Sequence, residues 1–383
     1  MPVMPSLSDA NALGSGVRER ANAANATFRS PLHKMVSTTP TELWNDSCSA
    51  GELRHAIEHG AVGATSNPTI VLGVVQQELK DWTGPIKDLF TTHASETEAQ
   101  ITWRLIEEMT VRGAEVLRPI FDRTEGKKGF LSVQTNPEYY KDTNALVTQA
   151  LHLSALAPNI QVKVPATAAG VAAIEQLTAR GISINATVCF TVPQAIAVAE
   201  AVERGLAARA AAGQSTSHVS SVCTIMVGRL DDWLKVCAEK EKLVPTPGTL
   251  DWAGVACMKR AYQIFKDAGY RTRLLVAAFR NHLHWSEFIG GDVILTIPPA
   301  WQRRYNASSV EIKARMGNPV PAQALSELVD QLPEFRRAYE PKGLTLSEFD
   351  RYGATARTLR TFLGSYFDLV ALIRDLRLPD PDK

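Results

Sequence analysis

A single lysine within a short β-branched segment could serve as a nucleophile. Residues 159–167 read Asn-Ile-Gln-Val-Lys-Val-Pro-Ala-Thr and place Lys163 between Val162 and Val164. Side chains of a strand alternate between its two faces, so Lys163 points away from these valines. Because Pro165 cannot donate a hydrogen bond to a sheet, the strand is expected to end there. Lys163 then lies near the C-terminal end of the strand, which faces the ligand in parallel α/β folds.

The surroundings of Lys163 decide between two interpretations. On an edge strand, the side chain would extend into solvent and remain an ordinary ammonium group. Among apolar side chains, the charged form loses hydration and the pKa falls to roughly 7 or below. A neutral amine attacks a carbonyl carbon and forms a Schiff base. The sequence leaves both interpretations open.

Short β-rich runs alternate with helical stretches from residue 41 onward. Eight such strands favour a closed (β/α)8 TIM barrel over an open doubly wound sheet, because no G-x-G-x-x-G motif follows any of them. Helical patterns near 69–80 and 96–118 predict a helical insertion between strands two and three. The candidate strands are 42–46, 61–65, 129–134, 160–164, 182–188, 219–227, 273–278 and 292–297.

The two ends of the chain are expected to lie outside this alternation. Residues 1–38 are rich in Ser, Ala, Asn and Pro, which is typical of a flexible N-terminal extension. Residues 39–383 then form one barrel domain. The segment from Ala324 to Leu378 has helical periodicity and predicts additional C-terminal helices that pack over the barrel. A subunit interface, as in a homodimer, is the alternative use of these helices.

Composition narrows the class of protein. The 383 residues are 45% hydrophobic and carry a formal net charge of +1. This balance does not favour binding to nucleic acid or to a membrane surface, so an anionic ligand must be held by a few local cations. The five cysteines form no C-x-x-C pair, which is typical of reduced thiols. No apolar run of about 18 residues and no signal-like N-terminus occur, so we expect a soluble, cytoplasmic protein.

Polar residues gather at the predicted C-terminal ends of the strands. Each alone has an ordinary explanation, since Asn67 precedes a proline, Asp46 could cap the next helix, and arginines after strands are usually solvated. Together, a carboxylate, an amine, amides and two guanidinium groups would suit a phosphorylated carbonyl compound. The candidates are Asp46, Thr65, Asn67, Gln134, Lys163, Asn185, Thr187, Thr224, Arg229 and Arg280.

Four segments resemble the signature segments of the transaldolase family, and the resemblance covers roughly residues 41–300. It implies a (β/α)8 class I aldolase of the pentose phosphate pathway that moves a dihydroxyacetone unit between sugar phosphates without a metal or organic cofactor. The segments are Gly-Ala-Thr-Ser-Asn-Pro-Thr-Ile at 63–70, Gln-Val-Lys-Val-Pro-Ala-Thr at 161–167, Ile-Asn-Ala-Thr-Val-Cys-Phe at 184–190 and Val-Gly-Arg-Leu-Asp-Asp-Trp at 227–233.

The resemblance also implies roles for individual residues. Lys163 matches the Schiff-base lysine, Asp46 matches the carboxylate that takes the hydroxyl proton during cleavage, and Thr187 helps to hold a catalytic water. The matched substrate-binding positions comprise amides for substrate hydroxyls, phosphate-binding arginines and flanking residues. They are Thr65, Asn67, Asn185, Thr224, Met226, Arg229, Ala278 and Arg280.

Three positions depart from the transaldolase pattern. Gln134 stands where a glutamate normally acts as acid and base through the water, and an amide cannot transfer a proton in this way. A glutamine here resembles the related fructose-6-phosphate aldolases, which carry a tyrosine where this chain has Met226. Thr224 and Ala278 stand where serines are usual.

Three classes of function therefore remain open. The first is transaldolase-type transfer through a lysine Schiff base, or a related aldolase or transferase with altered substrates. The second is a weakly active paralogue that binds sugar phosphate, favoured by Gln134 and Ala278. The third is another barrel chemistry, such as metal-dependent hydrolysis. It is disfavoured because H-E-x-x-H is absent and the helical spacing of His282 and His284 separates their rings.

Overall fold

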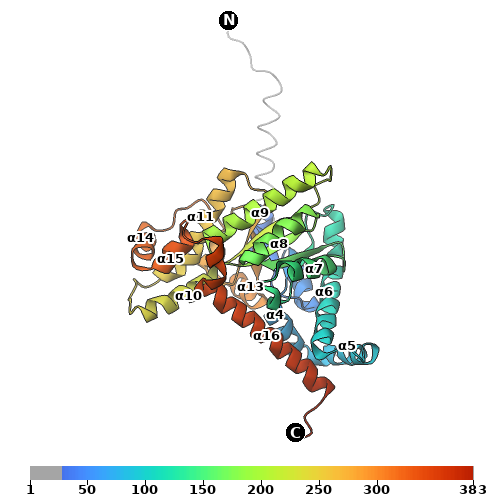
Figure 1. Cartoon of the computed structure of the whole chain (residues 1–383). Helices are drawn as coiled ribbons and strands as arrows, with labels where there is room; N and C mark the ends of the chain where they lie inside the picture. The colour runs from blue at the N-terminus through green and yellow to red at the C-terminus, as the bar shows by residue number, and fades with distance from the viewer. Residues whose placement is uncertain (1–27, 383) are drawn as a thin grey trace.

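Eight parallel strands close into a barrel in the computed structural model, which describes residues 28–382 (Figure 1). The strands follow one another in chain order around the barrel, and β8 pairs with β1 from Glu42–Ile294 to Asn45–Ile297. This confirms the predicted (β/α)8 TIM barrel. The strands are β1 (Glu42–Asn45), β2 (Ala61–Thr65), β3 (Phe130–Gln134), β4 (Ile160–Pro165), β5 (Ile184–Cys189), β6 (Ser221–Met226), β7 (Arg273–Ala277) and β8 (Ile294–Ile297).

The middle strands are buried along their whole length. Every residue of β3, β4, β5 and β6 is buried, because helices cover the outer face and side chains fill the interior. Val162 and Val164 are fully buried, as expected for β-branched residues in a parallel sheet. The helices around the strands are α3 (Ala50–Glu58), α7 (Thr143–Ser154), α8 (Ala168–Ala179), α9 (Val192–Ala211), α10 (Val227–Lys240), α11 (Ala253–Ala268), α12 (Leu283–Ser286) and α13 (Pro299–Asn306).

The first α-helix after each of the strands β1 to β5 begins at a polar capping residue. The side chain of this residue accepts a hydrogen bond from a backbone N–H of the first helical turn, which would otherwise lack a partner. Such caps are Ser49, Asn67, Asp142, Thr167 and Thr191. They set the points at which the chain turns from the strand ends into the helices.

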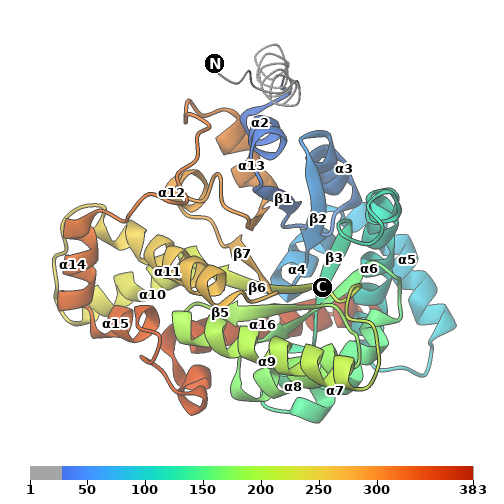
Figure 2. The same ribbon diagram turned by 90° about the horizontal axis from the view of Figure 1, so that it is seen from above.

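The predicted helical insertion lies between β2 and β3 (Figure 2). The pattern near 69–80 corresponds to α4 (Pro68–Gln77), whereas α5 (Leu79–Thr92) lies mostly outside the predicted patterns. Glu78 lies at the break between α4 and α5 and accepts hydrogen bonds from Ser49 Oγ at 2.5 Å and from Trp82 Nε1 at 3.3 Å. The last helix of the insertion, α6 (Glu98–Arg123), begins with a capping box formed by Thr97 and Gln100.

The C-terminal segment supplies α14 (Ala322–Gln331), α15 (Pro333–Tyr339) and α16 (Gly353–Arg377), as predicted. Helix α16 is the long red helix of Figure 1, and it runs along the C-terminal ends of the strands. Near its start, Thr358 Oγ1 lies 3.5 Å from Arg229 Nη1, and further along Ser365 Oγ lies 2.8 Å from Thr69 Oγ1. The helix therefore spans the rim from the end of β6 to the start of α4.

Residues 31–38 of the expected N-terminal extension form helix α2 (Pro31–Thr38), whereas residues 1–27 lie outside the described part of the chain. Leu32 and Met35 of α2 are fully buried, and Trp285 Nε1 donates a hydrogen bond to Met35 Sδ at 3.2 Å. The packed part of the chain therefore begins before residue 39, our expected start of the domain. Within residues 28–382, no helix is long and apolar enough to cross a membrane.

Candidate active site

Lys163 lies inside the barrel near the C-terminal end of β4. Only 4% of it is exposed, and its Nζ donates a hydrogen bond to the carbonyl oxygen of Ser66 at 3.2 Å. Burial is the main cause that lowers the pKa of Lys163 to about 8, and the nearby Asp46 carboxylate partly opposes the shift. The edge-strand interpretation is wrong, because β4 pairs with β3 on one side and with β5 on the other.

Asp46 directly follows β1 and faces the same interior. Its Oδ1 accepts a hydrogen bond from Thr65 Oγ1 at 2.6 Å, and the Thr65 hydroxyl also lies 2.6 Å from Thr296 Oγ1. Loss of hydration raises the pKa of Asp46, whereas Lys163, Thr65 and Arg229 act in the opposite direction. Asp46 and Lys163 thus form an interacting pair in which burial disfavours both charges.

Two polar side-chain atoms flank Lys163 and have no hydrogen-bond partner among residues 28–382. They are Gln134 Oε1 on β3 and Thr187 Oγ1 on β5, and both are buried. Gln134 pairs in register with Lys163, and Thr187 pairs with Pro165, so the two side chains come from the strands on either side of the lysine. A buried polar atom without a partner costs about 1–3 kcal/mol. These atoms therefore fit a polar substrate group or a water molecule near Lys163.

Asn185 and Thr224 lie in the same interior but bind other protein groups. Asn185 Nδ2 donates to Ser132 Oγ at 3.2 Å, and Asn185 Oδ1 accepts from Thr224 Oγ1 at 2.6 Å. Ser132 Oγ in turn donates to Gln161 Oε1 at 2.9 Å. This network holds the Asn185 amide in one orientation and leaves one of its amide hydrogens for a ligand.

Asn67 has the role that its position before a proline suggests. Its Oδ1 accepts a hydrogen bond from the backbone N–H of Ile70 at 3.0 Å and caps α4. The side-chain amide nitrogen is the group that remains for a ligand. The contact of Ser66, the residue before Asn67, with Lys163 was not predictable from the sequence, because a backbone carbonyl makes it.

Two arginines reach the rim from the ends of β6 and β7. Arg229 lies in the first turn of α10, and its guanidinium group is 5.3 Å from the centre of the Phe362 ring on α16. Burial, followed by the positive charge of Arg280, lowers the pKa of Arg229. No ion pair of Arg229 is present among residues 28–382. A mostly buried cation of this kind favours an anionic ligand.

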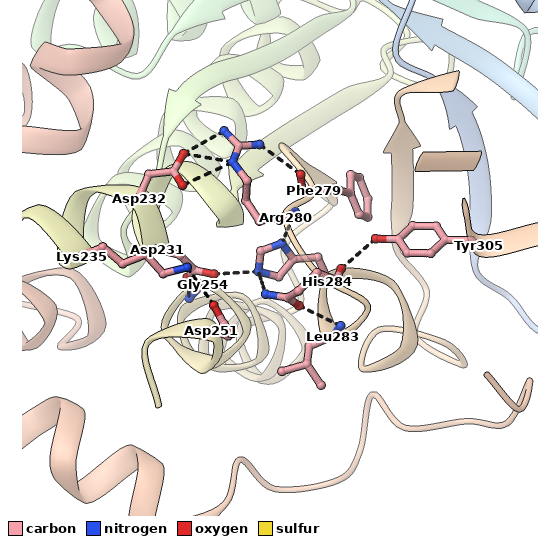
Figure 3. Close-up of polar contacts among 11 residues, drawn as sticks. Asp231, Asp232, Lys235, Asp251, Gly254, Phe279, Arg280, Leu283, His284 and Tyr305 are labelled. Atoms are coloured by element: carbon pink, nitrogen blue, oxygen red, sulfur yellow. Dashed lines mark hydrogen bonds and ion pairs between the residues drawn. The ribbon is translucent and has the colours of Figure 1, made fainter. Parts of the chain in front are cut away.

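Arg280 is held differently, by Asp232 one turn along α10 from Arg229. Arg280 Nε and Nη2 donate to Asp232 Oδ2 at 3.1 Å and 2.8 Å (Figure 3). Asp232 lies in the resembling segment 227–233, but its ion pair requires the loop after β7 to approach α10, which the sequence does not show. Met226 is buried at the end of β6 and pairs with Ala277, next to Ala278. Ala278 has a φ of 66°.

The arrangement can support chemistry at a carbonyl group. A buried amine with a lowered pKa can attack the carbonyl carbon, and a neighbouring carboxylate can accept a proton. The cations of Arg229 and Arg280 lie at the rim, where they could bind a phosphate. In the described part of the chain, no three His, Cys, Asp or Glu side chains are grouped so that they could hold a metal ion.

The sequence is similar to those of known enzymes. Residues 43–338 match the sequence profile of the family described as Transaldolase/Fructose-6-phosphate aldolase. A transaldolase of Thiobacillus denitrificans is 31% identical over 340 residues, which cover 80% of this chain and 90% of that protein. A transaldolase of Neisseria gonorrhoeae is 28% identical over 342 residues, covering 80% and 96% of the two chains. The chain therefore belongs to the transaldolase/fructose-6-phosphate aldolase family of enzymes.

Proposed function

We propose that this enzyme transfers a dihydroxyacetone unit between sugar phosphates through a Schiff base on Lys163. The observation that carries the proposal is the buried Lys163 amine, with a pKa lowered to about 8, beside the Asp46 carboxylate. At pH 7 about one lysine in ten is then neutral and able to attack a ketone.

In the proposed reaction, Lys163 Nζ attacks the ketone carbon of a ketose phosphate, and the resulting carbinolamine loses water to give a protonated imine. Asp46 removes the proton of the hydroxyl group beyond the bond that breaks. The O–H electron pair becomes a carbonyl, and the electrons of the carbon–carbon bond move into the imine, which becomes an enamine. The aldose phosphate leaves. The enamine carbon then attacks the carbonyl of an acceptor aldehyde, Asp46 returns the proton, and water releases the product ketose.

Gln134 and Thr187 are proposed to bind the water or hydroxyl group that enters and leaves at the imine carbon. Their buried oxygens, which have no partner in the described part of the chain, come from the strands on both sides of Lys163. Gln134 orients this group but transfers no proton. Asp46 is therefore the proposed acid and base for the other proton transfers as well.

The phosphate group of the substrate is proposed to bind between Arg229 and Arg280. The supporting observations are the mostly buried guanidinium of Arg229 and the electrostatic interaction between the two arginines. A phosphate there would offset the repulsion between the two cations and accept charge-assisted hydrogen bonds. Asn67 and Asn185 would bind substrate hydroxyls through their remaining amide hydrogens.

A transaldolase-like aldolase or a transferase with altered substrates is the second candidate. Gln134 favours it, because this enzyme lacks the usual carboxylate at that position. Assays that separate the two candidates use fructose 6-phosphate with and without erythrose 4-phosphate. Glyceraldehyde 3-phosphate released only with the acceptor supports transaldolase, and release at the same rate without it supports an aldolase. No turnover of either kind would support the weakly active paralogue. A role in the pentose phosphate pathway, a cytoplasmic location and a homodimer remain predictions.

A further inference from the structure

The loop after β7 carries Arg280 in an unusual backbone conformation. Ala278 has a φ of 66°, a left-handed conformation that side chains other than glycine rarely adopt. The loop also passes close to α10, because a Cβ atom on Gly228 would lie 2.0 Å from the carbonyl oxygen of Ala278. A conformation of this kind persists only where the surrounding structure holds it.

His284, at the start of α12, holds the backbone of this loop. Its ring is fully buried, and its Nδ1 accepts a hydrogen bond from the backbone N–H of Arg280 at 3.0 Å (Figure 3). Its Nε2 lies 2.8 Å from Asp231 Oδ2. Since Nδ1 is an acceptor, the ring must be neutral, with its proton on Nε2, where it donates to Asp231.

Asp231 is fully buried and accepts hydrogen bonds on both oxygens. Oδ1 accepts from the backbone N–H of Gly254 at 2.8 Å, near the start of α11, and Oδ2 accepts from His284. Burial raises the pKa of Asp231, whereas the His284 hydrogen bond lowers it. A carboxylate in this place sets the tautomer of His284, because it can only accept hydrogen bonds.

Two consecutive aspartates of α10 thus act on the two parts of one arginine. Asp232 binds the guanidinium of Arg280, and Asp231 reaches its backbone through His284 (Figure 3). Successive side chains of a helix point about 100° apart, so one aspartate can face the interior while the other faces the rim. On the far side of the loop, Tyr305 donates a hydrogen bond to the carbonyl oxygen of Asn281 at 2.8 Å.

We infer that Asp231 and His284 are positioning residues for phosphate recognition. Asp231 holds the His284 ring in one tautomer and orientation, and His284 Nδ1 holds the backbone N–H of Arg280, so that the guanidinium lies beside Arg229. Neither residue touches the substrate. The inference rests on the proposed role of Arg280 as a phosphate ligand.

Two substitutions of His284 separate positioning from a purely structural role. In His284→Asn, the amide oxygen takes the place of Nδ1 and still accepts from Arg280, whereas the bond to Asp231 is lost. In His284→Gln, the amide group takes the place of Nε2 and still donates to Asp231, whereas the Arg280 N–H loses its acceptor. Each variant therefore lacks one of the two contacts, to Arg280 or to Asp231, that the buried His284 ring makes. His282→Gln is the matched control, because His282 is exposed and its side chain makes no hydrogen bond within the described residues.

The measurements are the KM for fructose 6-phosphate and the shift in Tm that inorganic phosphate produces. His284→Gln should raise KM by about tenfold and reduce the phosphate-dependent Tm shift, which are also the effects expected of Arg280→Ala. His284→Asn should change KM far less than His284→Gln, and His282→Gln should behave as wild type. Equal effects of His284→Asn and His284→Gln on KM would overturn the inference.

The failure of this inference differs from the failure of the proposed phosphate site. If Arg280→Ala removes phosphate binding and His284→Gln does not, positioning is refuted and the phosphate site stands. If Arg280→Ala leaves phosphate binding unchanged, both are refuted. Should His284→Gln not fold, Asp231→Asn provides the test. The new amide must turn its NH₂ group toward Gly254 N–H or toward His284 Nε2–H, and each orientation places two donors against each other. We therefore expect a disturbed His284 ring and a raised KM. An unchanged KM would overturn the inference.

Discussion

Raising the pH across the pKa of Lys163 should increase the rate of its reaction with a ketone in a predictable way. With a pKa of about 8, about 9% of the amine is neutral at pH 7, compared with about 0.03% for a lysine at the ordinary value of 10.5. The protein environment thus increases the reactive amine at pH 7 by about 300-fold. The neutral fraction rises about tenfold from pH 6 to pH 7, reaches one half near pH 8 and levels off above about pH 9.

The assay should use dihydroxyacetone as donor and glyceraldehyde as acceptor, because neither contains a phosphate that titrates in this range. The pH dependence of kcat/KM reports the pKa values of the free enzyme. Its rising limb should bend near pH 8. The positive charge of Arg229 lowers the pKa of Lys163, so Arg229→Ala should move the bend to higher pH. A profile that still rises tenfold per pH unit through pH 9 would refute the lowered pKa.

Three further predictions concern the neighbours of Lys163. Arg229→Ala and Arg280→Ala should each raise the KM for phosphorylated donors by about tenfold or more while affecting dihydroxyacetone far less, and equal losses for both donors would indicate a structural role instead. Asp46→Asn should nearly abolish cleavage of fructose 6-phosphate, because an amide cannot accept the hydroxyl proton. The circular dichroism spectrum of this variant should match that of the wild type. Retained turnover would assign the proton transfer to another group. Gln134→Glu should keep the fold and raise transaldolase turnover, since a positioned acid/base contributes about 10² to 10⁴ in rate; loss of activity would mean that the Gln134 amide donates a hydrogen bond that glutamate cannot give.

The strands of the barrel were predictable because their local signal and their final environment agree. Runs such as 160–164 combine β-branched residues with a following proline, and the structure buries them between two neighbours in the sheet. The predicted boundaries differ from the observed ones by at most two residues. The break at Glu78 was not predictable from the local pattern, and Glu78 there accepts a hydrogen bond from Ser49, which lies 29 residues earlier.

The candidate site was likewise predictable only in part. Most of its residues lie near the C-terminal ends of strands or in the turns that follow them, so their common rim could be predicted from the barrel alone. The burial of Lys163 could not, because a lysine near the end of a barrel strand can also extend from the rim into solvent, and its 4% exposure depends on the side chains around it. The contact between Asp231 and His284 joins residues 53 positions apart and depends on how α12 packs near α10. The exposed His282 and the buried His284 do differ as their spacing predicts.

The covalent intermediate provides the most direct test of the Schiff-base proposal. The enzyme should be incubated with fructose 6-phosphate and borohydride, digested and analysed by mass spectrometry. Borohydride reduces the imine to a stable secondary amine, so we predict that the peptide containing Lys163 gains the mass of the reduced sugar adduct. Lys163→Arg should give no adduct, since arginine supplies no neutral amine at pH 7. An adduct on another lysine, or none with any ketose phosphate, would contradict the proposed mechanism.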